Sequence, residues 1–448
     1  MASAAQTSDA PIHALINYED PYVQPLILSA LKKRLPSASY KLVDSIKDLP
    51  SSTPCLQFVQ YESIDWDRLM SHSESLANAY VIRKALIRKH YLSTTIANWI
   101  TKYPDSALKR GAKPSVEFEV DYAEFLDDAL VEAWELKESW ARNEEVGEEE
   151  KEKREWWILK PGMSDRGQGI RLFSSEEELT AIFEEWDPES DDEEEEEDAR
   201  SDAGDKDEGD GIITSQLRHF VAQPYIHPPL LLAPPGDATQ LRKFHIRTYV
   251  LASGALKVFV YKPMLALFAA RPYAAPWETD FESEEEREDA MRAHLTNTCI
   301  QESGDREGSV GLFWNLPDDL TSQPGAEVNA QSDWKEQVFA QIKAITGATF
   351  EAAARGMSIH FQPLPNAFEI FGLDFMVGIE EDGSVNTYLL EVNAFPDFRQ
   401  TGDELSDMIE GLFEGVVDEA IAPFFGKAAE RKGENEMVKV LDVDLGRR

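Results

Sequence analysis

The feature that most constrains this chain is a series of apolar segments of strand length after residue 155. They are "WWILKP", "IRLF", "HFVAQPYI", "KFHIRTYVLA", "ALKVFVYK", "FEIFGLDFMVGI" and "TYLLEVN". Segments this rich in Val, Ile, Phe and Tyr, and this closely spaced, predict a large, mainly antiparallel sheet. Helical spacing of apolar residues predicts helices around 331–356 and 403–430.

The first part of the chain has a different pattern. Over 12–61, short apolar runs ("HALINY", "YKLVDS", "CLQFVQY") alternate with the amphipathic stretch "YVQPLILSALKKRL". This alternation is typical of a small α/β domain. The expected fold class is therefore α/β (α+β), with a small N-terminal α/β domain before the large sheet.

Charge and cysteine content exclude several functions. The net charge of −40 argues against binding to nucleic acid or to an anionic membrane surface, because both require clustered cations. No apolar run approaches the roughly 18 residues of a spanning helix, and the N-terminus shows no secretory leader. Two cysteines, Cys55 and Cys299, make no disulfide framework, which suits a reducing compartment. We expect a cytoplasmic protein without a membrane or nucleic-acid partner.

One segment contributes a large share of this charge. Residues 187–210 contain 15 acidic and 2 basic residues and no apolar residue larger than alanine. Such a segment cannot form a core, so we predict a disordered insertion over 187–211 whose deletion leaves folding and nucleotide binding intact. A solubilising loop is the simplest interpretation, and a docking site for a basic partner is the alternative.

The stretch "WWILKPGMSDRGQGIRLF" places a lysine at the end of a predicted strand, before a glycine-rich loop. Lys160 could reach phosphate oxygens, while Gly167 and Gly169 would let backbone N–H groups approach them without a Cβ in the way. The glycines match neither the P-loop nor the dinucleotide-binding pattern. An ordinary hairpin with a surface lysine remains the alternative.

Three oxygen donors lie on two apolar strand patterns near the C-terminus. Asp374 is in "FGLDFMV", and Glu391 and Asn393 in "LLEVNAFPDF" share a face because they are two residues apart. Carboxylates among apolar neighbours are costly unless a cation satisfies them, and Mg²⁺ takes one or two carboxylates together with phosphate oxygens and waters. The alternative is a pair of hydrated strand ends.

Five motifs in order, "WILKPGMSDRGQGI", "RKFHIRTYVL", "HLTN", "FGLDFMV" and "LLEVNAFPDF", resemble the tubulin–tyrosine ligase family, as does "VIRKALIRK" in the N-terminal part. The "EVNAFPDF" variant is similar to a divergent, fungal-type branch. The resemblance implies an ATP-grasp fold and the cofactors ATP and Mg²⁺. It assigns catalytic roles to Arg247, Asn297 and Lys84, nucleotide contacts to Lys160, Gly167, Gly169, Gln223, Tyr225, Lys243 and Thr296, and the metal to Asp374, Glu391 and Asn393.

The expected domain division follows from the composition and the resemblance together. It comprises a disordered N-terminus (1–11), a small N-terminal and substrate-groove region (12–140), a charged linker (141–155), an ATP-grasp catalytic domain (156–430) that contains the acidic insertion, and a C-terminal tail (431–448).

Three positions depart from the family pattern. Pro224 replaces a lysine that contacts adenine, and His245 replaces an aspartate, exchanging an anionic acceptor for a group expected near half charge at neutral pH. Leu267 stands at the position of a family arginine, and Arg271 is about 13 Å further along an extended strand. Either the loop bends or that cation is absent. A role for His245 as a metal ligand is the sharper alternative, but no second histidine has suitable spacing.

The resemblance implies ligation of an amino acid, tyrosine first, to a protein carboxylate through an acyl phosphate. Tubulin is the first candidate protein partner, since its acidic tails would need a cationic track. The only dense basic stretch lies in the N-terminal region, and most of its cations should be solvated. We expect the track to consist of Arg83, Lys84, Arg88, Lys89 and Lys102. The alternatives are an ATP-binding interaction module without ligase activity and a ligase for a non-tubulin carboxylate.

Overall fold

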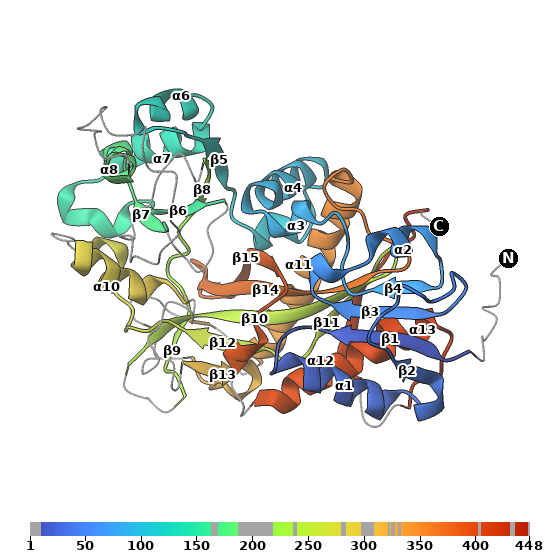
Figure 1. The fold of residues 1–448 in the computed structure, drawn as a ribbon. Helices are drawn as coiled ribbons and strands as arrows, with labels where there is room; N and C mark the ends of the chain where they lie inside the picture. Colours follow the sequence, from blue (N-terminus) through green and yellow to red (C-terminus); the bar gives the residue numbers. More distant parts are fainter. Residues whose placement is uncertain are drawn as a thin grey trace, which may run out of the picture. The chain divides into compact units, whose positions relative to one another are not determined.

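The computed structural model describes residues 10–162, 169–186, 218–235, 240–278, 284–296, 309–320, 323, 328–329, 333–401, 405–430 and 435–446. The chain forms two compact units, each with its own core (Figure 1). Unit 1 comprises Met1–Ala112, Ile226–Tyr273 and Arg292–Arg448, and unit 2 comprises Lys113–Tyr225 and Ala274–Met291.

The N-terminal part of unit 1 is a parallel sheet in the order β2-β1-β3-β4. Its strands are β1 (Ile12–Asn17), β2 (Tyr40–Leu42), β3 (Cys55–Val59) and β4 (Ser75–Ala77). Parallel neighbours need crossover connections, and α1 (Val23–Arg34) and α2 (Trp66–Ser71) lie in two of them. This arrangement confirms the predicted small N-terminal α/β domain.

The main sheet of unit 1 is antiparallel, as predicted, and is organised around one long strand, β10 (Arg242–Ser253). One edge of β10 pairs with β12 and β11, and the other with β9 and β14, which in turn pairs with β15. The other strands are β9 (Leu231–Leu232), β11 (Lys257–Tyr261), β12 (Leu265–Phe268), β13 (Val310–Leu312), β14 (Phe368–Ile379), β15 (Val385–Ala394) and β16 (Met437–Asp442).

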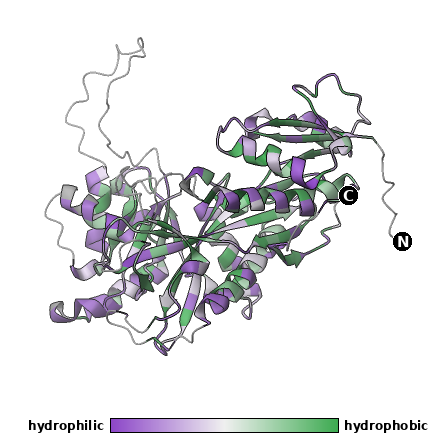
Figure 2. Ribbon diagram, turned by 90° about the horizontal axis from the view of Figure 1, so that it is seen from below, coloured by the Kyte–Doolittle hydropathy of each residue, from purple (hydrophilic) through white to green (hydrophobic). Residues whose placement is uncertain are grey.

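Both faces of this sheet are covered, because alternate side chains of β10 enter different cores. Phe244, Ile246 and Val250 join the core with α11 (Trp334–Gly356) and the shorter helices α3 (Lys84–Ile87), α4 (Lys89–Lys102) and α5 (Leu108–Gly111). Tyr249 and Leu251 join the core with α1, α12 (Ser406–Val416), a π-helical turn (Val417–Ile421) and α13 (Ala422–Phe424). Hydrophobic residues are accordingly concentrated in the strands (Figure 2).

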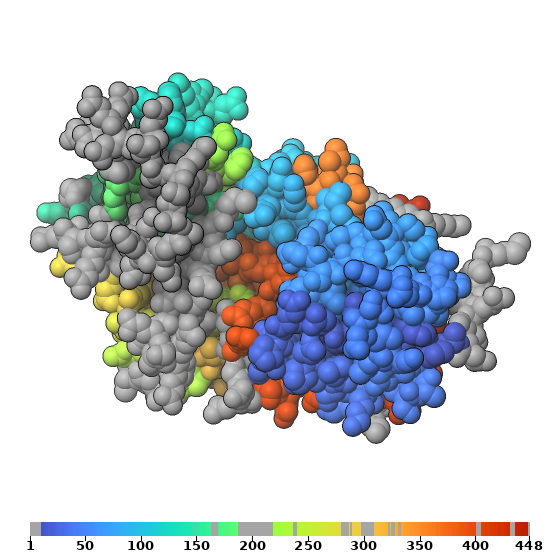
Figure 3. Space-filling model, viewed as in Figure 1, coloured from blue at the N-terminus to red at the C-terminus, as the bar shows by residue number. Residues whose placement is uncertain are grey.

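The N-terminal and C-terminal segments of unit 1 lie side by side. Lys33 on α1 pairs with Glu410 on α12 at 2.7 Å, and the blue and red segments adjoin on the surface in Figure 3. Arg34 is buried and reaches Glu414 at 2.9 Å. The small domain is thus packed onto one face of the main sheet.

Unit 2 is a second antiparallel sheet, in the order β5-β8-β6-β7. Its strands are β5 (Val116–Glu119), β6 (Trp157–Pro161), β7 (Arg171–Phe173) and β8 (His219–Pro224), and its helices include α6 (Leu126–Ala129), α7 (Trp134–Glu144) and α8 (Glu176–Trp186). Aromatic side chains such as Trp140, Phe183 and Phe220 fill its core. The helix α10 covers Glu284–His294.

The compact units differ from the sequence-based division at three places. Residues 113–140 belong to unit 2 because β5 pairs with β8. Residues 141–155, expected as a linker, contain the end of α7 and a 3₁₀ turn, Glu148–Lys153, and Arg142 makes a bidentate ion pair with Glu155. Within 431–448, expected as a tail, β16 pairs with β11. The predicted disordered residues 1–9 and the acidic insertion lie outside the described residues.

No helix in the described part of the chain is both long and apolar enough to span a bilayer.

Candidate functional site

Three neighbouring strands of unit 1 bring predicted site residues into one row. The register pairs Arg247 on β10 with Asp374 on β14, and Asp374 with Glu391 on β15. Strand alternation places Lys243 on the same face of β10 as Arg247, as the sequence predicted. Towards its C-terminal end, this face becomes the apolar core of Tyr249 and Leu251. The polar row therefore lies where an apolar sheet face ends.

The central carboxylate of the row is buried and paired. Both oxygens of Asp374 accept hydrogen bonds from Arg247, from Nε to Oδ1 and from Nη2 to Oδ2, the latter at 2.9 Å. Burial alone would lower the pKa of Arg247, but the Asp374 carboxylate outweighs it and holds the pKa above its ordinary value. The guanidinium therefore stays charged, and it fixes the orientation of Asp374.

The other two oxygen donors are also in contact with Asp374 or with each other. Asn393 Nδ2 lies 3.3 Å from Asp374 Oδ2 and 3.2 Å from Glu391 Oε1. Lys89 Nζ on α4 lies 3.7 Å from Glu391 Oε2, with both side chains about one-quarter exposed. Sequence reasoning placed Lys89 on a substrate-binding track and missed this contact, because nothing local links α4 to β15.

The space that Arg247 occupies depends on a glycine that sequence reasoning also missed. A Cβ on Gly372 would lie 3.3 Å from Arg247 Cδ and 3.0 Å from Pro396 Cβ. Gly372 is the cross-strand neighbour of Asn393 and of Tyr249. The absent side chain leaves room for Arg247 to pass under Pro396 and reach Asp374.

His245 corrects one expectation from the sequence. It is buried, with Nδ1 2.6 Å from Thr296 Oγ1 and Nε2 3.6 Å from Asp374 Oδ1. Burial lowers the pKa of His245 despite the opposing charge of Asp374, so the expectation of a half-charged ring at neutral pH is wrong. The position that carries an aspartate in the family pattern holds a neutral ring here. Thr296, predicted to contact phosphate, contacts this ring in the structure, and its role towards the nucleotide stays a prediction.

Lys243 is buried at the start of β10. Burial, together with the charge of Lys243, lowers the pKa of His294 to about 3. His294 is therefore neutral at physiological pH.

The structure also shows why Arg271 does not supply the positive charge that the family pattern has at position 267. Leu267 is the cross-strand partner of His245 and is fully buried in the core with α12. β12 ends at Phe268, so Arg271 lies beyond the strand. An arginine at position 267 would have to place its charge at the edge of an apolar core.

Unit 2 brings two predicted nucleotide residues together. Lys160 Nζ on β6 donates to Gln223 Oε1 on β8 at 2.9 Å. Tyr225 follows β8 and is buried, with its N–H bonded to the Trp156 carbonyl. Gly169 has φ +70°, a backbone conformation that favours glycine after the loop. Gly167, like Asn297 in unit 1, lies outside the described residues.

The basic segment 83–102 differs from the expected solvated track. Arg83 is buried, with Nε 2.9 Å from Glu369 Oε1 and its guanidinium 4.1 Å from the Tyr61 ring centroid. Burial raises the pKa of Glu369 to about 8 although Arg83 opposes the shift. Lys84 and Lys102 are exposed, and α3, which begins at Lys84, packs against β15. Arg83 is therefore not part of a solvated basic face.

The side chains of Asp374, Glu391 and Asn393 fit Mg²⁺ better than a metal that requires Cys or His ligands. Two carboxylates and a side-chain amide meet across β14 and β15, the number and type that Mg²⁺ takes from proteins. The described residues contain no group of three or more His, Cys, Asp or Glu side chains arranged for a metal, which also leaves His245 without partners for ligation. Arg247 and Lys89 balance the two carboxylates in this structure.

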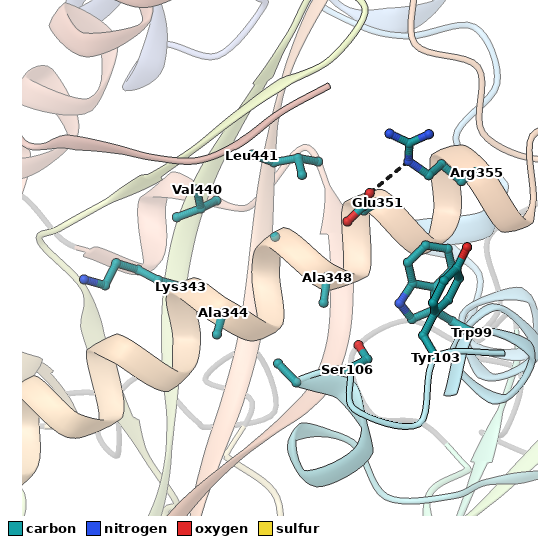
Figure 4. A pocket seen from close by; sticks show the side chains of 12 residues that line it. Trp99, Tyr103, Ser106, Lys343, Ala344, Ala348, Glu351, Arg355, Val440 and Leu441 are labelled. Atoms are coloured by element: carbon teal, nitrogen blue, oxygen red, sulfur yellow. Dashed lines mark hydrogen bonds and ion pairs between the residues drawn. The ribbon is translucent and has the colours of Figure 1, made fainter. Parts of the chain in front are cut away.

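A separate cavity of about 520 Å³ lies among α4, α11 and β16 (Figure 4). It is lined by Trp99 and Tyr103 on one side and by small residues of α11 such as Ala344 and Ala348 on the other. It includes none of the predicted site residues, so no role in the polar row follows from it.

Comparison with known proteins agrees with this architecture. The structure is similar to the crystal structure of the C-terminal domain of K. lactis Pby1, described as an ATP-grasp enzyme that interacts with the mRNA decapping enzyme Dcp2. The TM-score is 0.66 at 36% identity, covering 97% of this chain and 99% of that one. The fold is therefore that of the ATP-grasp class.

Sequence comparison narrows this class. The model of the tubulin-tyrosine ligase family matches residues 67–429. A probable tubulin–tyrosine ligase of Schizosaccharomyces pombe is 42% identical over 442 residues, with 97% of each chain covered. Pby1 of Saccharomyces cerevisiae, also named a probable tubulin–tyrosine ligase, is 40% identical over 94% of this chain and 54% of its own length. This chain belongs to the tubulin-tyrosine ligase family.

Proposed function

We propose that this chain is an ATP-dependent carboxylate–amine ligase whose magnesium is held by Asp374, Glu391 and Asn393. The observation that carries the proposal is the row of Arg247, Asp374 and Glu391 across three strands, with Asn393 in contact with both carboxylates. A buried cluster of charged groups with shifted pKa values is typical of functional sites. Family membership supplies the reaction class.

Each proposed role in unit 1 follows from a charge and a position. Lys243 and Arg247, two cationic side chains on one face of β10, bind phosphate oxygens. Lys84, the exposed first residue of α3, acts close to the carboxylate row. Asn297 follows Thr296 and offers a neutral donor. Mg²⁺, when bound, neutralises phosphate charge. Arg247, which bonds both oxygens of Asp374 here, would also be able to contact phosphate oxygens when Mg²⁺ shares that carboxylate.

The proposed roles in unit 2 concern the nucleotide. Lys160 is held by Gln223 at the end of a strand, so its ammonium group is oriented before any ligand arrives. Gly167 and Gly169 provide backbone N–H groups for phosphates, and Gln223 and Tyr225 line the adenine. Pro224 offers no side-chain donor, so adenine recognition would rest on backbone groups.

The acceptor is proposed to be a protein carboxylate, with the tubulin tail as first candidate and tyrosine as the first amino acid. The relatives' names support this choice. The net charge of −40 opposes encounter with an acidic tail, but at physiological salt the screening length is about 8 Å, so local cations decide. Lys84, Arg88 and Lys102 remain available for this contact, whereas Arg83 is buried.

The test is incorporation of labelled amino acids into detyrosinated tubulin by purified protein, with Mg-ATP present. Incorporation by the unmutated protein should fall with added salt. Lys102→Glu with Arg88→Glu should reduce incorporation and make what remains less sensitive to salt, because the attraction that salt screens is gone. Lys439→Glu serves as a control at an exposed cation elsewhere. Failure to incorporate any amino acid, together with clear Mg-ATP binding, would reject tubulin as acceptor.

A second function is favoured by one specific observation. His245 is neutral and Leu267 is buried, so two polar positions of the family pattern are apolar or uncharged here. We propose as the alternative an ATP-binding interaction module, the role suggested by the Dcp2 interaction of Pby1. A ligase for another carboxylate shares the same site. ATP hydrolysis that depends on an added acceptor would separate a ligase from the module, which would bind ATP without turnover.

A further inference from the structure

A surface of unit 2 exposes large apolar side chains that its core does not use. Tyr122, Phe125, Val131 and Trp134 are 50%, 48%, 55% and 66% exposed. They lie within 13 residues of sequence, along the 3₁₀ turn Ala123–Phe125, α6 and the first residue of α7. The rings of Tyr122 and Phe125 are in edge contact, with centroids 6.2 Å apart. We call these four residues the aromatic surface.

The exposure is not a by-product of a poorly filled core. Leu126, Leu130 and Leu136, from the same stretch, are buried in the core of unit 2 and form the apolar side of this segment. The opposite side should then be polar in a surface with no further role. Instead it carries an exposed tryptophan and two other aromatic rings, the residue types that dominate binding energy at protein interfaces.

The stretch of sequence that carries the aromatic surface is strongly acidic. Residues 124–135 contain five carboxylates, Glu124, Asp127, Asp128, Glu132 and Glu135, and no lysine or arginine. All five are exposed, and none is in an ion pair with another described residue. Such a field attracts cations and repels acidic partners, nucleic acid and anionic lipid alike.

The size of the surface limits the occupant. With aromatic side chains of roughly 150–250 Å² each and about half of each exposed, the surface offers on the order of 400 Å². A standard protein–protein interface buries about 800 Å² on each partner, about twice the area of this surface. A single peptide segment with two or three apolar anchors matches the area.

We infer that the aromatic surface docks a protein segment in which basic side chains alternate with large apolar ones. Apolar anchors of the segment pack on Trp134, Phe125 and Tyr122, while its lysines or arginines meet the carboxylates around them. This contact is independent of the proposed nucleotide chemistry, since none of these residues belongs to the polar row or to the Lys160 site.

The experiment is selection of a displayed library of random twelve-residue peptides on the full-length protein, followed by affinity measurement of synthetic consensus peptides by fluorescence anisotropy. Selected peptides should be enriched in Lys or Arg together with Phe, Leu or Trp. Trp134→Ser should weaken their binding about tenfold or more. Glu132→Lys with Glu135→Lys should do the same, and raising salt from about 0.05 to about 0.5 M should weaken binding to the unmutated protein.

Matched controls sit elsewhere on the chain. Ile359→Ser removes another exposed apolar side chain, and Glu336→Lys with Glu381→Lys reverses two exposed carboxylates, so neither should alter peptide affinity. Unfolding midpoints and Mg-ATP binding are compared for all variants to show that each folds. The proposal is overturned by selection of acidic or purely apolar peptides, by equal binding to Trp134→Ser, by an absence of binders, or by light scattering that shows a dimer lost on Trp134→Ser.

Discussion

The polar row of unit 1 and the aromatic surface of unit 2 use charge in opposite ways. In the row, Asp374 is buried and Arg247 satisfies both of its oxygens, so the geometry is set before a ligand arrives. The five carboxylates of residues 124–135 are exposed and make no ion pair with another described residue, so they attract a partner without fixing its orientation. Buried, paired charges therefore suit a small ligand with fixed geometry, whereas exposed charges suit a flexible segment.

The largest expected effect comes from breaking the pair in unit 1. Asp374→Ala leaves the Arg247 guanidinium buried without its partner, and we expect a loss of about 3–5 kcal/mol in the free energy of unfolding. Urea unfolding followed by circular dichroism measures it. Asp442→Ala, which removes an exposed partner of Lys439, should cost less than about 1 kcal/mol. Equal losses of unfolding free energy in the two variants would show that the buried Arg247–Asp374 pair contributes no more to stability than an exposed ion pair.

The free energy of unfolding should depend on pH through the buried His294 of unit 1. The pKa of His294 is lowered to about 3, so the neutral ring stabilises the fold fully above the unfolded pKa of about 6.5 and this stability is lost as pH falls towards 3. Between pH 7 and 5 the loss is about 2 kcal/mol. The free energy of unfolding of His294→Gln should therefore fall less over this range. An identical pH slope would contradict the assignment.

A smaller effect is expected from closing the space beside Arg247. Gly372→Ala places a methyl group 3.0 Å from Pro396 Cβ and 3.3 Å from Arg247 Cδ, so both must move by a few tenths of an ångström. We expect a destabilisation of about 1 kcal/mol and weaker Mg-ATP binding. Gly147→Ala, where a Cβ meets nothing within 4 Å, should leave binding unchanged. Unaltered Mg-ATP affinity in Gly372→Ala would argue that Arg247 does not bind phosphate.

The smallest stability effect belongs to the exposed surface of unit 2. Trp134→Ser removes a side chain that is two-thirds exposed, so the free energy of unfolding should change by no more than about 0.5 kcal/mol even though peptide affinity falls. Thermal unfolding with and without peptide measures both quantities. A large destabilisation would show that Trp134 packs in the fold and is not a docking residue.

Local patterns were sufficient to predict the strands and which side chains share a face. The two-residue spacing of Glu391 and Asn393 and the four-residue spacing of Lys243 and Arg247 follow directly from strand alternation. The small N-terminal α/β domain followed from the alternation of apolar runs with one amphipathic helix. These predictions depend only on neighbours in sequence.

Contacts between distant segments could not be predicted in the same way. Arg83 looked like part of a solvated basic face because its neighbours are charged, but it pairs with Glu369, nearly 300 residues away. Lys89 reaches Glu391 for a similar reason. The charge of His245 depends on burial by segments around it, which periodicity within β10 does not reveal.

The most direct test of the central claim is calorimetric titration of ATP into the full-length protein with saturating Mg²⁺ and, separately, with EDTA. Glu391→Gln removes one metal-binding charge while keeping the size of the side chain, and Glu381→Gln is the control on an exposed turn. We expect the unmutated protein and the control to bind ATP only with Mg²⁺, and we expect Glu391→Gln to weaken this binding at least tenfold. Equal Mg-ATP affinity in Glu391→Gln and the unmutated protein would contradict this expectation.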